Sequence, residues 1–206
     1  MVEMKLAGES DFVFDFEKLG TNVAIQFSGG MESTLLLYLF LKEWHQRNSD
    51  KKYCAYTFQR WNRPIEKAKR LIKIISEHNN WDINHEVLDM PIIKECAVEA
   101  KLTKSMILER GHDSILAGVQ SFPDDESIRP KNIIIYPKDM GIVYAPFRYL
   151  QKHHTIDAYH QLNIEYILPH THSCGSNLDD PCNICYNCRE RIWGYEKLGM
   201  APNMGC

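Results

Sequence analysis

The chain has 206 residues, of which 44% are hydrophobic and 25% are charged, with a formal net charge of −3. These values predict one globular domain with at most a small appendage, and they exclude a disordered or collagen-like chain. The near balance of 24 basic and 27 acidic residues gives no general attraction to nucleic acid or anionic membranes. Because residues 1–16 are acidic and no apolar run is long enough to span a bilayer, we expect a cytoplasmic protein with no membrane segment.

Short apolar runs alternate with longer helical segments along the chain. Strands are expected at 22–27, 53–58, 83–88 and 114–119, with shorter ones at 133–136, 142–144 and 166–168. Helices are expected at 34–45, 64–78, 92–110 and 149–162. This alternation predicts an α/β fold with a doubly wound parallel sheet. We expect one domain over residues 1–169 and a small cysteine-rich appendage, residues 170–206, packed on it.

A glycine-rich turn, Ser28-Gly29-Gly30, separates the first expected strand from the first helix. Adjacent glycines let a ligand approach the backbone, and the helix N-terminus offers unpaired N–H groups. With the hydroxyls of Ser28 and Ser33, the segment predicts a cradle for phosphate or pyrophosphate. It lacks the Gly-Lys pair of a Walker A loop. The alternative is an ordinary strand-to-helix turn with a serine N-cap.

Four of the seven cysteines fall within fifteen residues, at Cys174, Cys182, Cys185 and Cys188. Disulfides are rare in a reducing cytoplasm, whereas four thiolates at this spacing suit a closed, structural metal site. We expect Zn²⁺ at this Cys₄ site. An iron–sulfur cluster is the alternative, because four cysteines suit both.

The order Ser-Gly-Gly-x-acid-Ser after a first strand resembles the PP-loop of the N-type ATP pyrophosphatases, which split ATP into AMP and pyrophosphate. Glu32 stands where that family usually has Asp, which keeps the charge but reaches one methylene further. The resemblance implies that ATP binds with Mg²⁺. The binding residues that it implies are Phe27, Ser28, Gly29, Gly30, Glu32, Ser33, Phe58 and Arg60.

The tail resembles that of the QueC family, the 7-cyano-7-deazaguanine synthases. Its segments Thr171-His172-Ser173-Cys174 and Pro181 to Arg189 match the family's Thr-x-Ser-Cys and closely spaced cysteines, with Asn183 at a position that is usually Gly. Phe58-Gln59-Arg60 and Ala145-Pro146-Phe147 with Lys152 resemble two further segments of that family. The resemblance therefore extends over about residues 23–198.

This resemblance implies an ATP-dependent ligase. Such an enzyme adenylates the carboxylate of 7-carboxy-7-deazaguanine, releases pyrophosphate and uses ammonia to form 7-cyano-7-deazaguanine. It implies catalytic roles for Ser28, Glu32, Ser33 and Lys152, and substrate contacts from Phe122, Asp124, Arg129 and His172. The alternatives are an ordinary surface lysine for Lys152 and a polar surface loop for residues 122–124. The family is often homodimeric, so a homodimer is expected.

Two other functions compete with this synthase. One is a QueC-like enzyme of an anti-phage, CBASS-type system, which joins the activated deazaguanine to a protein amine. The other is a non-catalytic nucleotide-binding zinc protein, although the basic stripe of a nucleic-acid-binding module is missing. A related tRNA thiolase would need a catalytic cysteine pair away from the metal, and Cys54 and Cys96 are too isolated to supply it.

Overall fold

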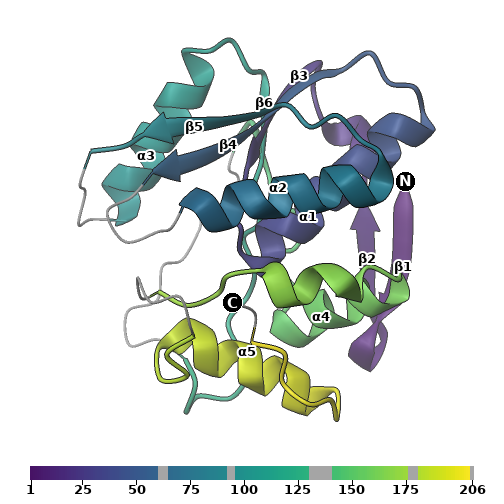
Figure 1. Ribbon diagram of the computed structural model, residues 1–206, viewed down its shortest axis with the longest axis vertical. Coiled ribbons are helices and arrows are strands. Elements are labelled where there is room, and N and C mark those ends of the chain that lie inside the picture. Colours follow the sequence, from purple (N-terminus) through teal and green to yellow (C-terminus); the bar gives the residue numbers. More distant parts are fainter. Residues whose placement is uncertain (60–64, 92–95, 130–140, 176–180, 205–206) are drawn as a thin grey trace.

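The computed structural model describes residues 1–59, 65–91, 96–129, 141–175 and 181–204. Within these ranges, no helix combines the length and the apolar character needed to cross a bilayer. Figure 1 shows a parallel sheet in the upper part of the molecule, with two helices of the C-terminal third stacked below it. An N-terminal hairpin lies along one side.

The five-stranded sheet has the order β5-β4-β3-β6-β7, and every neighbouring pair is parallel. The strands are β3 (Asn22–Gln26), β4 (Lys52–Gln59), β5 (His85–Asp89), β6 (Ser114–Leu116) and β7 (Val143–Tyr144). The chain moves outward from β3 to β5 and then returns to the other side of β3. The order reverses between β3 and β6, where ligands of such sheets bind beyond the carboxyl ends of the strands.

Both faces of the sheet are covered, which confirms the doubly wound α/β fold. Residues alternate between faces along β3: Val23 and Ile25 belong to the main core cluster, whereas Ala24 belongs to a second one. The main cluster contains the buried leucines of α1 (Met31–Gln46) and apolar residues of α2 (Ile65–Asn79). The second contains Ile107 of α3 (Cys96–Leu108).

The expected helices are present, with shifted ends. The first begins at Met31 rather than at residue 34, directly after the glycine turn. The last expected helix is shorter than 149–162 and is α4 (Lys152–Gln161). A helix in the cysteine-rich tail, α5 (Tyr186–Lys197), was not expected. It packs closely on α4, because a Cβ on Gly194 would lie 2.9 Å from the Lys152 Cγ.

Two expectations for strands need correction. The strand expected at 166–168 is part of a 3₁₀ helix, η3 (Glu165–His170), which contains Pro169. The N-terminal residues form an unexpected antiparallel hairpin of β1 (Val2–Leu6) and β2 (Ser10–Phe14). Two more short 3₁₀ helices are η1 (Ala7–Glu9) and η2 (Phe16–Lys18). The strand expected at 133–136 lies outside the described residues.

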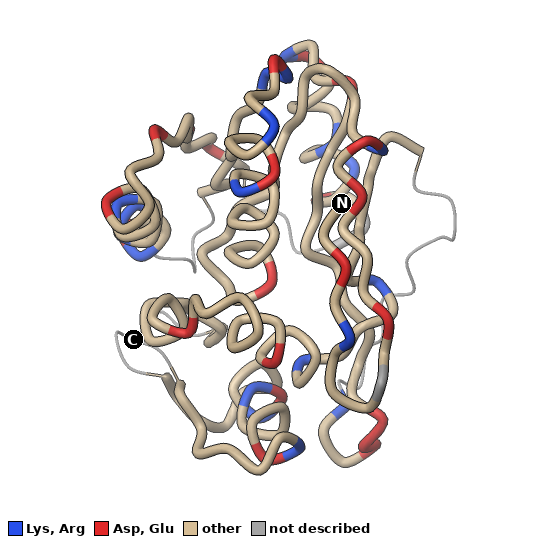
Figure 2. Tube along the Cα trace, turned by 90° about the vertical axis from the view of Figure 1, so that its right-hand side faces the viewer, with Lys and Arg blue, Asp and Glu red and all other residues tan. Residues whose placement is uncertain are grey.

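Charged residues are mixed along the described chain. Figure 2 shows Lys and Arg interspersed with Asp and Glu on the helices and on the hairpin. Many ion pairs are exposed, such as Lys5 with Asp11 and Lys69 with Glu66. Such pairs contribute little to stability. The buried pairs are therefore the informative ones, and one of them lies at the glycine-rich turn.

Candidate functional site

The glycine-rich turn is fixed by hydrogen bonds among its own residues. Gly29 has φ of +73°, in the left-handed region that favours glycine, and Gly30 is the N-cap of α1. The Ser33 hydroxyl donates to the Gly30 carbonyl at 3.1 Å and accepts from the Ser28 N–H at 3.1 Å. The two serine hydroxyls also lie 3.1 Å apart. The turn therefore holds one shape while the N-terminus of a 16-residue helix faces out of it.

Close packing keeps side chains away from this turn. A Cβ on Gly29 would lie 3.3 Å from the Ala68 Cα of α2. A Cβ on Gly118, two residues after β6, would lie 3.0 Å from the Ser33 N. The turn thus sits between the carboxyl ends of β3 and β6, at the reversal of the strand order. This is the position expected for a phosphate-binding loop.

A buried lysine lies beside the turn. Lys152, the first residue of α4, is only 4% exposed and forms ion pairs with Glu32 of α1 and, at 3.2 Å, with Glu190 of α5. Burial disfavours its charged form, but the two carboxylates outweigh that effect and raise the pKa of Lys152 above its ordinary value. The interpretation of Lys152 as an ordinary surface lysine is therefore wrong.

Glu190 is itself held by neutral donors. Its Oε1 accepts from the Tyr186 hydroxyl at 2.7 Å and from the Gln120 Nε2 at 3.1 Å. Gln120 in turn accepts from the Thr155 hydroxyl of α4 at 3.3 Å. A buried carboxylate with one cationic and two neutral partners has most of its hydrogen-bonding capacity used. Its position is therefore set by three separate segments of the chain.

The segment before the cysteines touches the turn directly. The His172 N–H donates to the Gly29 carbonyl at 2.8 Å, and the Lys67 Nζ lies 3.3 Å from the His172 Nδ1. A Cβ on Gly30 would lie 3.5 Å from the His172 carbonyl oxygen. These contacts place His172 and a basic residue of α2 at the edge of the candidate phosphate site.

Arg191 of α5 organises the same segment. Its side chain is fully buried and donates to carbonyl and hydroxyl oxygens rather than to a carboxylate among the described residues. Nη1 donates to the Thr171 carbonyl and hydroxyl at 3.1 and 2.9 Å and to the Ser173 hydroxyl at 3.1 Å. Nη2 donates to Leu168 O at 2.8 Å and Nε to Asn203 O at 2.6 Å. Arg191 therefore fixes the backbone on both sides of His172.

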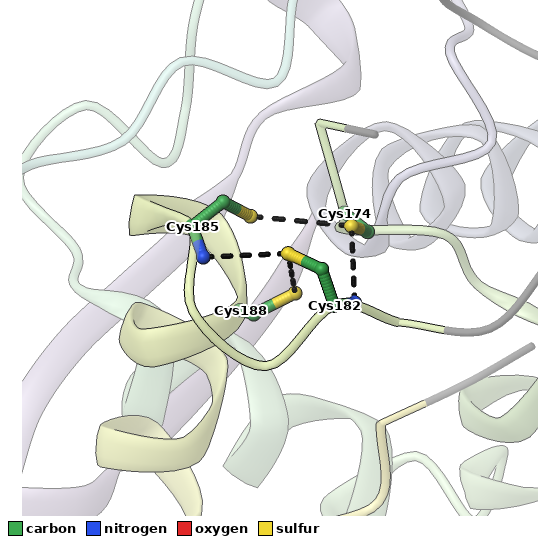
Figure 3. Close-up of side chains that lie close together, drawn as sticks. All are labelled: Cys174, Cys182, Cys185 and Cys188. Atoms are coloured by element: carbon green, nitrogen blue, oxygen red, sulfur yellow. Dashed lines mark hydrogen bonds between the residues drawn. The ribbon is translucent and has the colours of Figure 1, made fainter. Parts of the chain in front are cut away.

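The four clustered cysteines converge, as Figure 3 shows. Their Sγ atoms all lie within 4.8 Å of one another, with 4.0 Å between Cys174 and Cys185 and between Cys182 and Cys188. Cys185 is the N-cap of α5, and Cys188 lies in its first turn. Asn183 takes the left-handed backbone with φ of +58°, which asparagine tolerates better than most residues. The donor set and its convergence fit a bound metal.

The residues expected to contact substrate lie near α4 but have partners of their own. Gln151, the N-cap of α4, donates to the Asp124 carboxylate at 2.6 Å and to the Phe122 carbonyl at 3.1 Å. The Phe122 ring lies 6.2 Å from the Tyr186 ring. Arg129 donates to the Pro123 carbonyl at 2.7 Å, within its own loop.

Three of the expected ATP contacts remain to be described: Phe27, Phe58 and Arg60. Phe27 directly follows β3, is 2% exposed and belongs to the main core cluster. Phe58 is half-buried and packs against the second core cluster. Arg60 lies outside the described residues.

Sequence reasoning missed Glu190, Arg191, Gln120 and Tyr186. The run Cys188-Arg189-Glu190-Arg191 has the composition of an exposed helix face, and nothing in its spacing predicts burial. Gly194 is the one sequence feature that could have indicated the burial of this helix. A glycine inside a helix often marks close packing, and here it lets α5 approach the start of α4.

Two comparisons with known proteins give a match. The family described as "Queuosine biosynthesis protein QueC" matches residues 121–199, which include the loop of Phe122 and Asp124, α4, the cysteines and α5. The chain is also similar to the structure of the U34-tRNA thiolase NcsA from Methanococcus maripaludis, described with its [4Fe-4S] cluster. That match has a TM-score of 0.51 and 14% identity, and covers 87% of this chain. The chain spans 66% of the length of that structure, and a likeness at this identity shows a shared fold.

Proposed function

We propose that this chain is a divergent QueC-like protein of the PP-loop type and an ATP-dependent ligase acting on 7-carboxy-7-deazaguanine. The substrate carboxylate attacks the α-phosphorus of ATP, the bond to the β-phosphate oxygen breaks, and pyrophosphate leaves. Ammonia then displaces AMP to give the amide. Activation by a second ATP removes the amide oxygen and leads to 7-cyano-7-deazaguanine. The observation that carries this proposal is the buried Lys152–Glu32 pair beside the Ser-Gly-Gly turn.

The proposed roles follow from the charge that develops. Pyrophosphate departure needs preorganised donors and positive charge more than proton transfer. We assign the phosphates to Ser28, Gly29, Gly30 and Ser33, with Phe27 and Phe58 beside the nucleotide. Glu32 holds Mg²⁺, and Lys152 and Arg60 offset charge on the phosphates.

We assign the deazaguanine to the side of α4 and the tail. Phe122 stacks on the ring, Asp124 accepts from its N–H edge, and Arg129 and His172 complete the contacts. The support is that Phe122 and Asp124 are both hydrogen-bonded to Gln151, the residue before Lys152. Substrate binding on this surface places the acid close to the candidate phosphate site.

Zinc is the metal we propose at the cysteines. A tetrahedral ion with Zn–S bonds of about 2.3 Å needs sulfur atoms about 3.8 Å apart. The observed separations of 4.0 Å support a single ion. A four-iron cluster has iron and sulfide between its thiolates and needs wider spacing. With four protein ligands the zinc is structural, and it holds the start of α5 to the segment that touches Gly29.

A tRNA thiolase, the activity named for the similar structure, has less support. Cys54 is 3% exposed within β4, and burial raises the pKa of its thiol to about 11. A thiol of this kind is a poor nucleophile at neutral pH. Cys54 therefore does not fit the role of a reactive cysteine.

The test is pyrophosphate release from ATP by the metal-loaded protein, with and without 7-carboxy-7-deazaguanine and ammonium, followed by mass spectrometry. Release that needs both and yields amide or nitrile supports the synthase. Release with the acid alone, without amide, indicates a protein amine as acceptor, as in the CBASS-type alternative. No release under any condition contradicts the ligase. Light scattering on the same sample tests the proposed homodimer.

A further inference from the structure

We propose that Glu190 is a positioning residue that keeps the Lys152 ammonium beside the Ser-Gly-Gly turn when Mg²⁺-ATP draws Glu32 away. The inference rests on the proposed function, because it concerns the same nucleotide site. Glu190 belongs to the cysteine-rich tail, whereas the candidate phosphate site lies at the carboxyl ends of β3 and β6. The inference therefore gives a tail residue a role in that site.

The geometry gives Lys152 two carboxylate partners from two different helices. Glu32 comes from the first turn of α1 and Glu190 from α5, at 3.2 Å from the ammonium. The Glu32 side chain is 17% exposed, whereas those of Glu190 and Lys152 are 6% and 5% exposed. The more accessible carboxylate is the one at the turn, so it is the one free to change partners.

The charges explain why two carboxylates are present. One ammonium and two carboxylates leave one net negative charge, which by itself opposes the binding of a triphosphate. A divalent cation taken up by Glu32 reverses that balance. Lys152 then loses one partner, and a buried ammonium without a counter-ion is strongly unfavourable. Glu190 provides the remaining counter-ion, so that Lys152 stays charged and faces the phosphates.

Glu190 is suited to remain in place. Its Oε1 is fixed by Tyr186 and Gln120, which leaves Oε2 for the lysine. Its helix begins at Cys185, and Cys188 lies two residues before it. The cysteine cluster thereby sets the position of Glu190, and the tail contributes a charge to the nucleotide site as well as a support.

The experiment measures affinity for ATP by calorimetry on the full-length, metal-loaded protein at several Mg²⁺ concentrations. In Glu190→Gln, Glu32 is the one carboxylate partner of Lys152 that remains within the described part of the chain, so Mg²⁺ must compete with the lysine for it. We expect about tenfold weaker binding of Mg²⁺-ATP, the size expected for one charge-assisted bond, and a higher Mg²⁺ requirement. Binding of ATP without Mg²⁺ should change much less. Glu190→Asp should recover most of the affinity.

The matched control is Glu196→Gln, an exposed residue of the same helix, which should bind as the wild type does. Metal content and melting temperature of each variant show whether α5 is intact. In the double variant Lys152→Gln, Glu190→Gln, the second change should add nothing to the loss caused by the first, because Glu190 acts through Lys152.

If Glu190→Gln does not fold, Tyr186→Phe is measured instead. This change removes the hydrogen bond from the Tyr186 hydroxyl to the Glu190 carboxylate but keeps the charge. It should weaken Mg²⁺-ATP binding about threefold. If wild type and Glu190→Gln bind Mg²⁺-ATP with equal affinity, the inference is wrong and the proposed function is unaffected. The same holds if Glu190→Gln loses as much affinity for ATP without Mg²⁺ as with it. If Tyr186→Phe is the variant measured, equal affinity overturns it in the same way. A wild-type protein that binds no nucleotide overturns the proposed function and the inference together.

Discussion

The Ser-Gly-Gly turn and the cysteine-rich tail meet at one place but are built in different ways. The turn is closed by its own hydrogen bonds, which span no more than five residues, from Ser28 to Ser33, and it receives one further bond, from the His172 N–H. The tail is held by contacts between distant parts of the chain, such as Arg191 with Leu168 and Lys152 with Glu190. The turn therefore supplies a local shape, and the tail supplies the charges and supports around it. Substitutions in the tail should therefore weaken nucleotide binding at the turn as well as metal binding. Substitutions in the turn should weaken nucleotide binding and leave the metal content of the tail unchanged.

Loss of the metal should have the largest effect. In Cys188→Ser, we expect release of the metal and more than about 4 kcal/mol of destabilisation, because the start of α5 then has no anchor. Nucleotide affinity should be lost with it. Metal analysis, thermal unfolding and calorimetry measure the three changes. Cys54→Ala, in the core and outside the cluster, should keep metal and nucleotide binding. Full nucleotide affinity in a metal-free variant would contradict the link between tail and turn.

Arg191→Met should have the second largest effect on stability. The change removes the donor that Arg191 supplies to the buried Thr171 carbonyl and one of the donors to the Leu168 carbonyl, and it removes the bond to Asn203 O. It should cost about 3 kcal/mol in the free energy of unfolding. Arg191→Lys should recover only part of this loss, because an ammonium cannot reach all of these acceptors. Denaturant unfolding measures both variants. A loss below about 1 kcal/mol would show that the segment around His172 is held by other contacts.

Gly29→Ala tests the turn itself. A side chain at φ of +73° costs about 1 to 2 kcal/mol, and its Cβ would press on Ala68. Gly8→Ala is the matched control, since φ is +71° there and nothing lies within 4 Å of the added Cβ. We expect similar destabilisation in both variants and lost nucleotide binding only in Gly29→Ala. Metal content should stay unchanged in both. Equal nucleotide affinity in the two variants would contradict a binding role for the turn.

The smallest expected effect concerns pH and His153 of α4. Burial, together with His154 and Lys197, lowers the pKa of His153 to about 4 from an ordinary value of 6.5. Between those values the unfolded chain binds a proton that the folded chain does not, so stability falls as the pH falls through this range. His153→Gln should reduce the fall by less than about 1 kcal/mol, given its partial exposure. Melting temperatures at pH 7 and 5 measure it, with His160→Gln as control. An unchanged pH dependence would exclude His153 as a contributor.

The features that the sequence predicts well are those that depend on neighbouring residues. The β3-turn-α1 unit follows from a short apolar run, two glycines and a leucine-rich segment, and the converging cysteines follow from their spacing. The N-terminal hairpin was missed although its signal is present, because Phe12 and Phe14 are buried on alternate positions. The strand expected at 166–168 was wrong because three apolar residues before a proline do not distinguish a strand from a 3₁₀ turn.

The charged residues of the site could not be predicted in the same way. Lys152, Glu190 and Arg191 carry side chains that are usually exposed, and their burial depends on how α5 lies on α4. Only tertiary packing decides this. The residue types of the tail fit a metal site, but the partners of Glu190 and Arg191 come from segments that sequence spacing does not connect.

The central position of β3 has a consequence for the folding rate. β3 pairs with β4 on one side and with β6 on the other. The start of β6 is far from β3 in the sequence, since the hydrogen bond between Asn22 and Asp113 at this end of the pair joins residues 91 positions apart. Closing such a loop costs entropy before any contact compensates for it, so this topology folds slowly. Until it closes, one edge of β3 is open to pairing with another molecule. The Lys152–Glu32 contact spans 120 residues, so the proposed nucleotide site forms only after most of the chain has folded.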